Sequence, residues 1–330
     1  MIRIVVDAMG GDNAPGAAVK GALAALADER ISVILTGREK DITAALGGAL
    51  PERMRIIDAP EIIGADEAPA AAIKSKKQSS IVVGLNLLKN GEADAFVSAG
   101  NTGAVLAGAT VIVGRIKGIL RPALAVLLPN AKGFSFLIDA GANVDAKPEY
   151  LPQFAQMGSI YMENVIGINN PRVAIVNIGA EKEKGNALTK EAYPLLENAG
   201  VNFTGNIEAR DIALGGADVL VCDAFIGNVI LKYSEGFATA LLGMVKKELL
   251  STTLSKIGAF LSKNAFRNLK KSFDYSEVGG APFLGLNALV VKAHGSSDAK
   301  AISAAIRQCV AFVENDITGK IKEKLHSDME

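Results

Sequence analysis

Four glycine-containing turns follow apolar segments of the chain and bring polar side chains with them. They cover residues 7–12, 98–103, 139–145 and 177–181. Glycine allows backbone N–H groups to approach a ligand closely, and the N-terminus of a following helix favours an anion. Ligands of open α/β sheets bind outside the carboxyl ends of the strands, where such turns lie. The four turns therefore predict an α/β enzyme that handles a small anionic group such as phosphate.

The turn at 98–103 is the best candidate for an anion cradle, because an apolar strand leads through it directly into an apolar helix. Its backbone N–H groups and the Thr102 hydroxyl could converge on phosphate or on a thioester oxygen. The alternative is a plain strand–turn–helix joint with Thr102 as the N-cap. With the first and third turns it supplies these substrate-binding candidates: Asp7, Gly10, Gly11, Asp12, Ser98, Gly100, Asn101, Thr102, Gly103 and Asn143.

A lysine in the charged segment 181–186 is a further candidate. Lys184 could neutralise phosphate and stabilise an oxyanion, although a charge run is more often a solvated loop. Gly185 and Asn186, which follow it, predict a special backbone turn and so favour a functional role. Asn186 joins the substrate-binding candidates.

An asparagine and a histidine complete the set. Asn228 follows another strand end and could donate to an oxyanion, or it could cap the helix that begins there. His294 could contact an anionic substrate group, or it could line the site beside an N-cap at Ser297 or Asp298.

Several common chemistries are disfavoured by the sequence. It contains no G-x-G-x-x-G, no G-x-x-x-x-G-K-[ST] and no G-x-S-x-G pattern, which argues against dinucleotide, P-loop and serine-hydrolase functions. The 35 basic and 35 acidic residues balance, so no nucleic-acid partner is expected. Cys222 and Cys309 lack metal-ligand spacing, and the aspartates of the turns are better interpreted as acceptors for backbone N–H groups. We expect no metal and no cofactor.

Short β-branched segments alternate with longer helical ones, which predicts a mostly parallel sheet within one catalytic unit, 1–330. The expected strands cover 2–7, 32–36, 54–58, 95–98, 124–128, 134–139, 173–176, 219–222, 283–285 and 288–291. The expected helices cover 15–27, 79–90, 102–113, 150–166, 189–199, 228–247 and 297–317, before a polar tail that contains His326. A strand that starts at residue 2 leaves no room for a signal peptide, and no apolar segment is long enough to span a bilayer. A cytoplasmic protein is expected.

Segment 252–274 breaks this pattern and predicts a basic amphipathic helical hairpin. Apolar residues occur at helical spacing, with five basic residues and only one acidic residue among them, a net charge of +4. Such a segment is typical of a membrane-surface contact, but an amphipathic pair packed on its own sheet or across a dimer has the same pattern. The candidate membrane-contact residues are Leu254, Ile257, Phe260, Leu261, Lys263 and Phe266.

The motifs taken together resemble the bacterial phosphate acyltransferase (PlsX) family, the acyl-acyl carrier protein:phosphate acyltransferases. The matching segments are 6–15, 98–104, 139–145, 183–186, 203–208, 223–228 and 294–297, spread in the family's order over nearly the whole chain. The resemblance implies a Rossmann-like three-layer α/β sandwich related to phosphotransacetylases and isopropylmalate dehydrogenases. It implies transfer of a long-chain acyl group from acyl carrier protein to inorganic phosphate, giving acyl phosphate for phospholipid synthesis.

The resemblance also assigns individual roles. The family's essential lysine and asparagine correspond to Lys184 and Asn228, and segment 252–274 to its membrane contact. A homodimer, peripheral attachment to an anionic inner membrane surface and a downstream glycerol-3-phosphate acyltransferase as a further partner are implied as well. Two other functions remain as alternatives: a phosphotransacetylase-like enzyme that uses acyl-CoA, and a membrane-surface scaffold for lipid enzymes.

Overall fold

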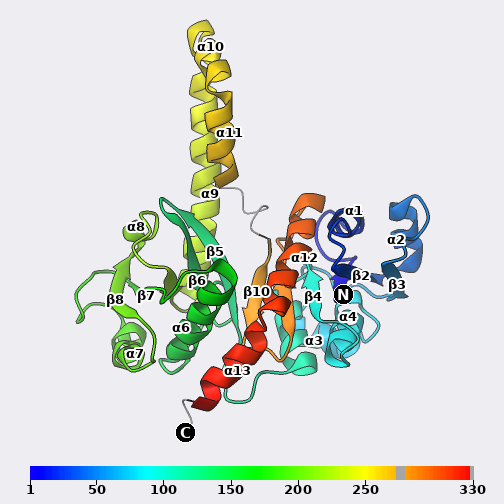
Figure 1. Ribbon diagram of the computed structural model, residues 1–330, viewed down its shortest axis with the longest axis horizontal. Coiled ribbons are helices and arrows are strands. Elements are labelled where there is room, and N and C mark those ends of the chain that lie inside the picture. The colour runs from blue at the N-terminus through cyan, green and yellow to red at the C-terminus, as the bar shows by residue number, and fades with distance from the viewer. Residues whose placement is uncertain (273–278, 328–330) are drawn as a thin grey trace.

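The computed structural model describes residues 1–272 and 279–327, and the side chains of all of these except 268–272 and 326–327 (Figure 1). The strands of these residues form one sheet of 11 strands in the order β3-β2-β1-β4-β11-β10-β5-β6-β9-β7-β8. The strand bounds are β1 Ile2–Asp7, β2 Ile31–Gly37, β3 Met54–Asp58, β4 Ala95–Ser98, β5 Ala123–Asn130, β6 Gly133–Ile138, β7 Val173–Asn177, β8 Phe203–Glu208, β9 Val219–Val221, β10 Ala281–Leu284 and β11 Leu289–Lys292.

Helices cover both faces of this sheet, as the predicted three-layer fold requires. Side chains alternate between the faces of a strand. Accordingly Ile4 and Val6 of β1 belong to one buried apolar cluster, while Val5 between them belongs to another. The helices are α1 Gly16–Ala25, α2 Glu39–Leu46, α3 Pro69–Ser75, α4 Ser80–Lys89, α5 Thr102–Gly108, α6 Tyr150–Tyr161, α7 Ala187–Glu197, α8 Ala209–Ile212, α9 Ala224–Leu249, α10 Thr253–Leu261, α11 Lys263–Ser272, α12 Ala299–Glu314 and α13 Ile317–Ser327.

The strands form two parallel groups that run in opposite directions within the sheet. Strands β3, β2, β1, β4 and β11 are parallel to one another, and so are β6, β9, β7 and β8. Between the groups the pairs β11–β10, β10–β5 and β5–β6 are antiparallel. The prediction of a mostly parallel sheet is confirmed. The three antiparallel pairings reverse the strand direction, so the carboxyl ends of the two groups point in opposite directions.

Every strand predicted from the sequence is present, but one strand and several short helices are additional. Strand β8 carries glycine and polar residues at the sheet edge, so its apolar alternation is weak. The predicted polar tail is wrong over Ile317–Ser327, which forms helix α13. There Ile317, Ile321 and Leu325 are buried at four-residue spacing, the pattern of an amphipathic helix.

A long helical projection rises from the body between the two groups of strands (Figure 1). Its outgoing arm is α9, and α10 and α11 return along it. The predicted hairpin 252–274 therefore corresponds, up to residue 272, to the returning arm alone. Phe273 and Asp274 of that prediction lie outside the described residues, as do the side chains of Leu269, Lys270 and Lys271.

Candidate active site

The turns at 7–12 and 98–103 form one cluster with the turn at 293–298 that follows β11, because strands β1, β4 and β11 are parallel neighbours. The buried Asp7 carboxylate accepts hydrogen bonds from the Ser98 hydroxyl at 2.7 Å and from the Met9 backbone at 3.1 Å. Ser98 Oγ in turn accepts from the Gly100 N–H at 3.0 Å. The Ser98 hydroxyl donates one hydrogen bond and accepts another, and both bonds hold the two turns together. Asp7 and Ser98 thus position the backbone.

Glycine is required in the first turn because the turns pack directly against one another. A Cβ on Gly10 would lie 2.5 Å from the backbone nitrogen of Gly100. Gly11 has a φ of +93°, and a Cβ there would meet the Gly295 carbonyl oxygen at 2.9 Å. The Asp12 N–H donates to that same oxygen at 2.8 Å, while the Asp12 side chain is exposed. These glycines shape the wall of the site.

The 98–103 turn leads into α5 as predicted, but its N-cap is Asn101, and Thr102 is the first helical residue. The side-chain Oδ1 of Asn101 accepts from the Ala104 N–H at 3.0 Å, and its Nδ2 donates to the Ala65 backbone carbonyl at 2.9 Å. Thr102 and Gly103 are half-buried in the first helical turn. The alternative of Thr102 as cap is wrong.

The turn after β6 and the turn after β9 form a second cluster. The buried Asp139 carboxylate accepts hydrogen bonds from the backbones of Gly141, Ala142 and Asn143 at 2.8–3.0 Å. The Asn143 amide donates to Asp139 at 2.6 Å and to the Pro122 carbonyl at 2.8 Å. Its two amide hydrogens are thereby directed into the protein, so Asn143 fixes the turn.

Helix α9 begins directly against this turn. A Cβ on Gly227 would lie 1.9 Å from the Asp139 carbonyl oxygen, so only glycine fits there. Asp223 caps the helix by accepting from the Ile226 N–H at 2.8 Å. Asn228 is therefore not the cap; it is exposed in the second turn of α9.

Lys184 lies in the loop after β7, the parallel neighbour of β9. The loop is held by Asn177, whose amide donates to the Lys184 carbonyl at 3.1 Å and to Asn206 of β8 at 3.0 Å. Gly185 has a φ of +110°, which confirms the predicted special turn, and Asn186 caps α7 by accepting from the Thr189 N–H at 2.9 Å. The Lys184 side chain is exposed.

Helix α9 connects the two clusters. Lys232 follows Asn228 by one helical turn on the same face. Its Nζ lies 3.4 Å from Nε2 of His294, which belongs to the turn after β11. The two groups of turns thus meet at one site, to which Asn228, Lys232 and His294 contribute.

Ser296 holds the His294 ring in place. Nδ1 of His294 lies 2.7 Å from the Ser296 hydroxyl and 3.2 Å from the Ser296 backbone nitrogen. Partial burial and the nearby charge of Lys232 lower the pKa of His294, which keeps the ring neutral at pH 7. The Lys232 ammonium, which lies beside Nε2, is a hydrogen-bond donor at this place. Asp298 caps α12, accepting from the Ala301 N–H at 2.9 Å, so capping there does not involve His294.

Two lysines of this site were missed in the sequence: Lys232 and Lys292. Lys292 ends the apolar strand β11 two residues before His294, and only 8% of it is exposed. A lysine that ends a buried strand directly before a glycine turn is the signal that could have identified it. The corresponding signal for Lys232 is its four-residue spacing from Asn228.

A cysteine nucleophile does not fit this site. Cys222 is buried behind the second cluster, with its Sγ 3.6 Å from the Asp139 carbonyl oxygen. Burial and the nearby carboxylates raise the pKa of its thiol well above the ordinary value, so it remains protonated.

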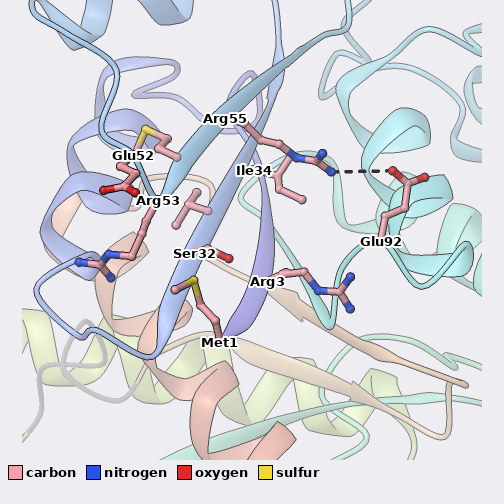
Figure 2. Close-up of a pocket in the computed structure, with 10 residues that line it drawn as sticks. Met1, Arg3, Ser32, Ile34, Glu52, Arg53, Arg55 and Glu92 are labelled. Atoms are coloured by element: carbon pink, nitrogen blue, oxygen red, sulfur yellow. Dashed lines mark ion pairs between the residues drawn. The ribbon is translucent and has the colours of Figure 1, made fainter.

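A cavity of about 530 Å³ opens at the amino ends of β1, β2 and β3, away from the turns (Figure 2). Its arginines are engaged in the protein. Arg55 pairs with Glu92 at 3.8 Å, Arg3 with Asp94 at 2.8 Å, and Arg53 donates to backbone carbonyls. This cavity is therefore separate from the site that the turns form.

Comparison with known proteins identifies the family. The family model described as "Fatty acid synthesis protein" matches residues 2–320. The chain belongs to this family. A phosphate acyltransferase of Clostridium perfringens strain SM101 is 51% identical over 328 residues, covering 98% of this chain and 97% of the relative. A phosphate acyltransferase of Clostridium acetobutylicum is 50% identical over 325 residues, covering 98% of each.

The resemblance predicted from the motifs is thereby confirmed, and as a member of this family the chain is an acyltransferase. Its fold is similar to a phosphotransacetylase from Streptococcus pyogenes, with a TM-score of 0.60 and 94% of each chain covered at 19% identity. That likeness confirms the predicted fold relationship to phosphotransacetylases.

Proposed function

We propose that this chain transfers a long-chain acyl group from acyl carrier protein to inorganic phosphate, giving acyl phosphate for phospholipid synthesis. The observation that carries the proposal is the contact between Lys232, one helical turn after Asn228 on α9, and His294 in the turn after β11. The Lys184 loop follows β7, the strand beside β9, which supports placing Lys184 near the start of α9. Membership in a family of named phosphate acyltransferases supports the acceptor.

Phosphate is itself a competent nucleophile, so the reaction needs positioning and charge stabilisation more than an activated side chain. A phosphate oxygen attacks the thioester carbonyl, and the C–O bond forms as a tetrahedral oxyanion. The C–S bond then breaks and the thiolate leaves, to be protonated as the free carrier thiol. Lys184 and Asn228 donate to the oxyanion in this scheme.

The test is a phosphate-dependent assay in which acyl-acyl carrier protein and acyl-CoA of the same chain length are offered separately. Acyl phosphate is trapped with hydroxylamine as the hydroxamate. Product from the carrier-protein donor, dependent on added phosphate, supports the proposal. Product from acyl-CoA alone would establish the phosphotransacetylase-like alternative, and no product from either donor would favour a scaffold.

We infer that the tip of the projection contacts an anionic membrane surface. Leu254, Ile257, Phe260 and Leu261 of α10 are 55–80% exposed, Lys263 is exposed beside them, and Phe266 is half-buried. An amphipathic helix with basic residues binds an anionic bilayer through both its apolar area and its charge. Within the part of the chain that the structure describes, no helix is both long and apolar enough to cross a bilayer.

We also infer a homodimer that covers a second apolar surface, on α9 itself. Val229, Tyr233, Phe237 and Met244 are 52–69% exposed at helical spacing. If this stripe joins two copies, Tyr233→Glu yields a monomer in sedimentation velocity, whereas the neighbouring exposed Ser234→Glu leaves a dimer. Equal mass for both variants and wild type would place the dimer interface elsewhere.

A further inference from the structure

A row of polar side chains crosses four parallel strands at their carboxyl ends. Thr36 of β2 is in register with Asp7 of β1, and Ser98 of β4 is in register with Lys292 of β11. The 2.7 Å hydrogen bond from Ser98 to Asp7 joins the two pairs. Side chains in register on neighbouring strands point to the same face. The row is buried, and its cation, Lys292, is 8% exposed.

Lys292 is an unusual residue to bury. Removing an ammonium group from water is costly unless it is paired. One of its three N–H donors is directed to the carbonyl of Ala293, and the charge of Asp7 favours its protonated form. Burial nevertheless lowers the pKa of Lys292 to about 8. Lys292 is thus buried at the edge of the site although its burial costs free energy.

Further basic groups gather at the same place. The charged and titratable groups that act on Lys292 are Asp7 on β1, Asp12 in the first turn and Lys232 on α9; His294 follows two residues later. Lys232 and Lys292 repel each other, and each of them lowers the pKa of His294. Lys232 also pairs with Glu235 of α9 at 2.8 Å, and the charge of Glu235 raises the pKa of His294. Like charges that converge from separate elements are stabilised by an anion placed between them.

We propose that Lys292 is a phosphate-binding residue of this site, and that Lys232 and His294 complete the subsite for inorganic phosphate. The inference rests on the proposed use of phosphate as acyl acceptor and names where that phosphate binds. Asp7 and Ser98, whose hydrogen bonds stay within the turns, position Lys292. The subsite lies between the 98–103 turn and the start of α12.

The first test separates the two substrates kinetically. Lys292→Gln removes a charge-assisted contact, which corresponds to roughly a 10- to 100-fold rise in KM for phosphate. KM for the acyl donor stays within about twofold. The matched control is Lys320→Gln on α13, a half-buried lysine that contacts Asn164, and it changes neither KM. An unchanged phosphate KM in folded Lys292→Gln overturns the proposal, as does a rise confined to the acyl donor, which would assign the site to a phosphate of the donor.

The second test keeps the positive charge, so it also serves if Lys292→Gln fails to fold. A lysine with a pKa near 8 loses its proton as pH rises through 8, and phosphate binding weakens with it. In Lys292→Arg the guanidinium stays charged over this range. We expect KM for phosphate to rise above pH 8 in wild type and to remain flat in the arginine variant. Identical profiles overturn the proposal.

A binding measurement without acyl donor separates this inference from the proposed function. Inorganic phosphate should raise the melting temperature of wild type and of Lys320→Gln. Lys292→Gln should need at least tenfold more phosphate for the same rise in melting temperature. If wild type forms no acyl phosphate yet shows this difference, the proposed function fails and the phosphate subsite stands. Equal stabilisation of Lys292→Gln and wild type refutes the subsite.

Discussion

Carboxylates in this site hold the backbone so that cationic and amide groups can face the ligand. Asp139 collects the N–H groups of one turn, Asp223 caps α9, and Asp7 fixes the Ser98 turn. Hydrogen bonds to a charged group contribute roughly 1.5–3 kcal/mol each. Because the hydrogen bonds of these carboxylates lie inside the protein, the groups that we propose to face the negative charge of the substrate are Lys184, Asn228, Lys232 and Lys292.

Lys184→Ala should reduce the rate of acyl transfer roughly 10²- to 10³-fold, the scale for losing one oxyanion donor. The control is Lys182→Ala in the same loop, because Lys182 pairs with Glu197 at 2.7 Å and lies over the Tyr193 ring. That variant should retain turnover within about twofold. Single-turnover rates measure both, and equal rates for the two variants would remove Lys184 from the mechanism.

Sequence patterns located polar side chains at the ends of the strands, but they did not reveal which partner each side chain binds. Ser98 and Asn143 were predicted to bind substrate, yet their hydrogen bonds hold the turns. A single polar side chain has the same signature in either role, because the partner that decides it is distant in the chain. Lys292 was missed for a related reason: its importance comes from register with Ser98, and register is a tertiary property.

Helix α9 shows how one element serves both the site and the surface. Asn228, Lys232 and Glu235 share one face by their spacing, while Val229 and Tyr233 lie on another face that is exposed. The predicted helix 228–247 is confirmed, but it begins four residues earlier, at Ala224. Its start is set by the Asp223 cap, a local signal that the prediction overlooked, and by packing of Gly227 against the Asp139 turn, which is a tertiary contact.

Gly227→Ala should destabilise the protein and misplace Asn228, because the new methyl group would lie 1.9 Å from the Asp139 carbonyl oxygen. Overpacking of this kind costs about 1–3 kcal/mol. Gly236→Ala in the same helix meets no atom within 4 Å and should stabilise by about 0.5–1 kcal/mol through helix propensity. Denaturant unfolding measures both. A Gly227→Ala protein as stable as wild type would mean that α9 can shift at no cost.

At the scale of the whole molecule, the alternating pattern predicted a layered α/β fold, and the structure has it. The pattern could not reveal that three antiparallel pairings divide the sheet, because strand direction depends on which strands become neighbours. The contact between Lys232 of α9 and His294 after β11 joins the two sides of that division. The projection of α9, α10 and α11 extends from the same helix that carries Asn228, so one helix connects the candidate site with the proposed membrane contact (Figure 1).

The proposed membrane contact can be tested with two variants that change the charge equally. Leu254 on α10 is 80% exposed, and Asn264 on α11 is also exposed. Leu254→Glu and Asn264→Glu add the same negative charge, but only the first removes an apolar side chain worth about 1.5–3 kcal/mol when buried in a bilayer. In flotation with anionic vesicles, we expect Leu254→Glu to bind at least tenfold more weakly than Asn264→Glu. Neutral vesicles should bind wild type less, because the basic residues then have no anionic partner. If both glutamate variants float as wild type does, the tip of the projection is not the membrane contact.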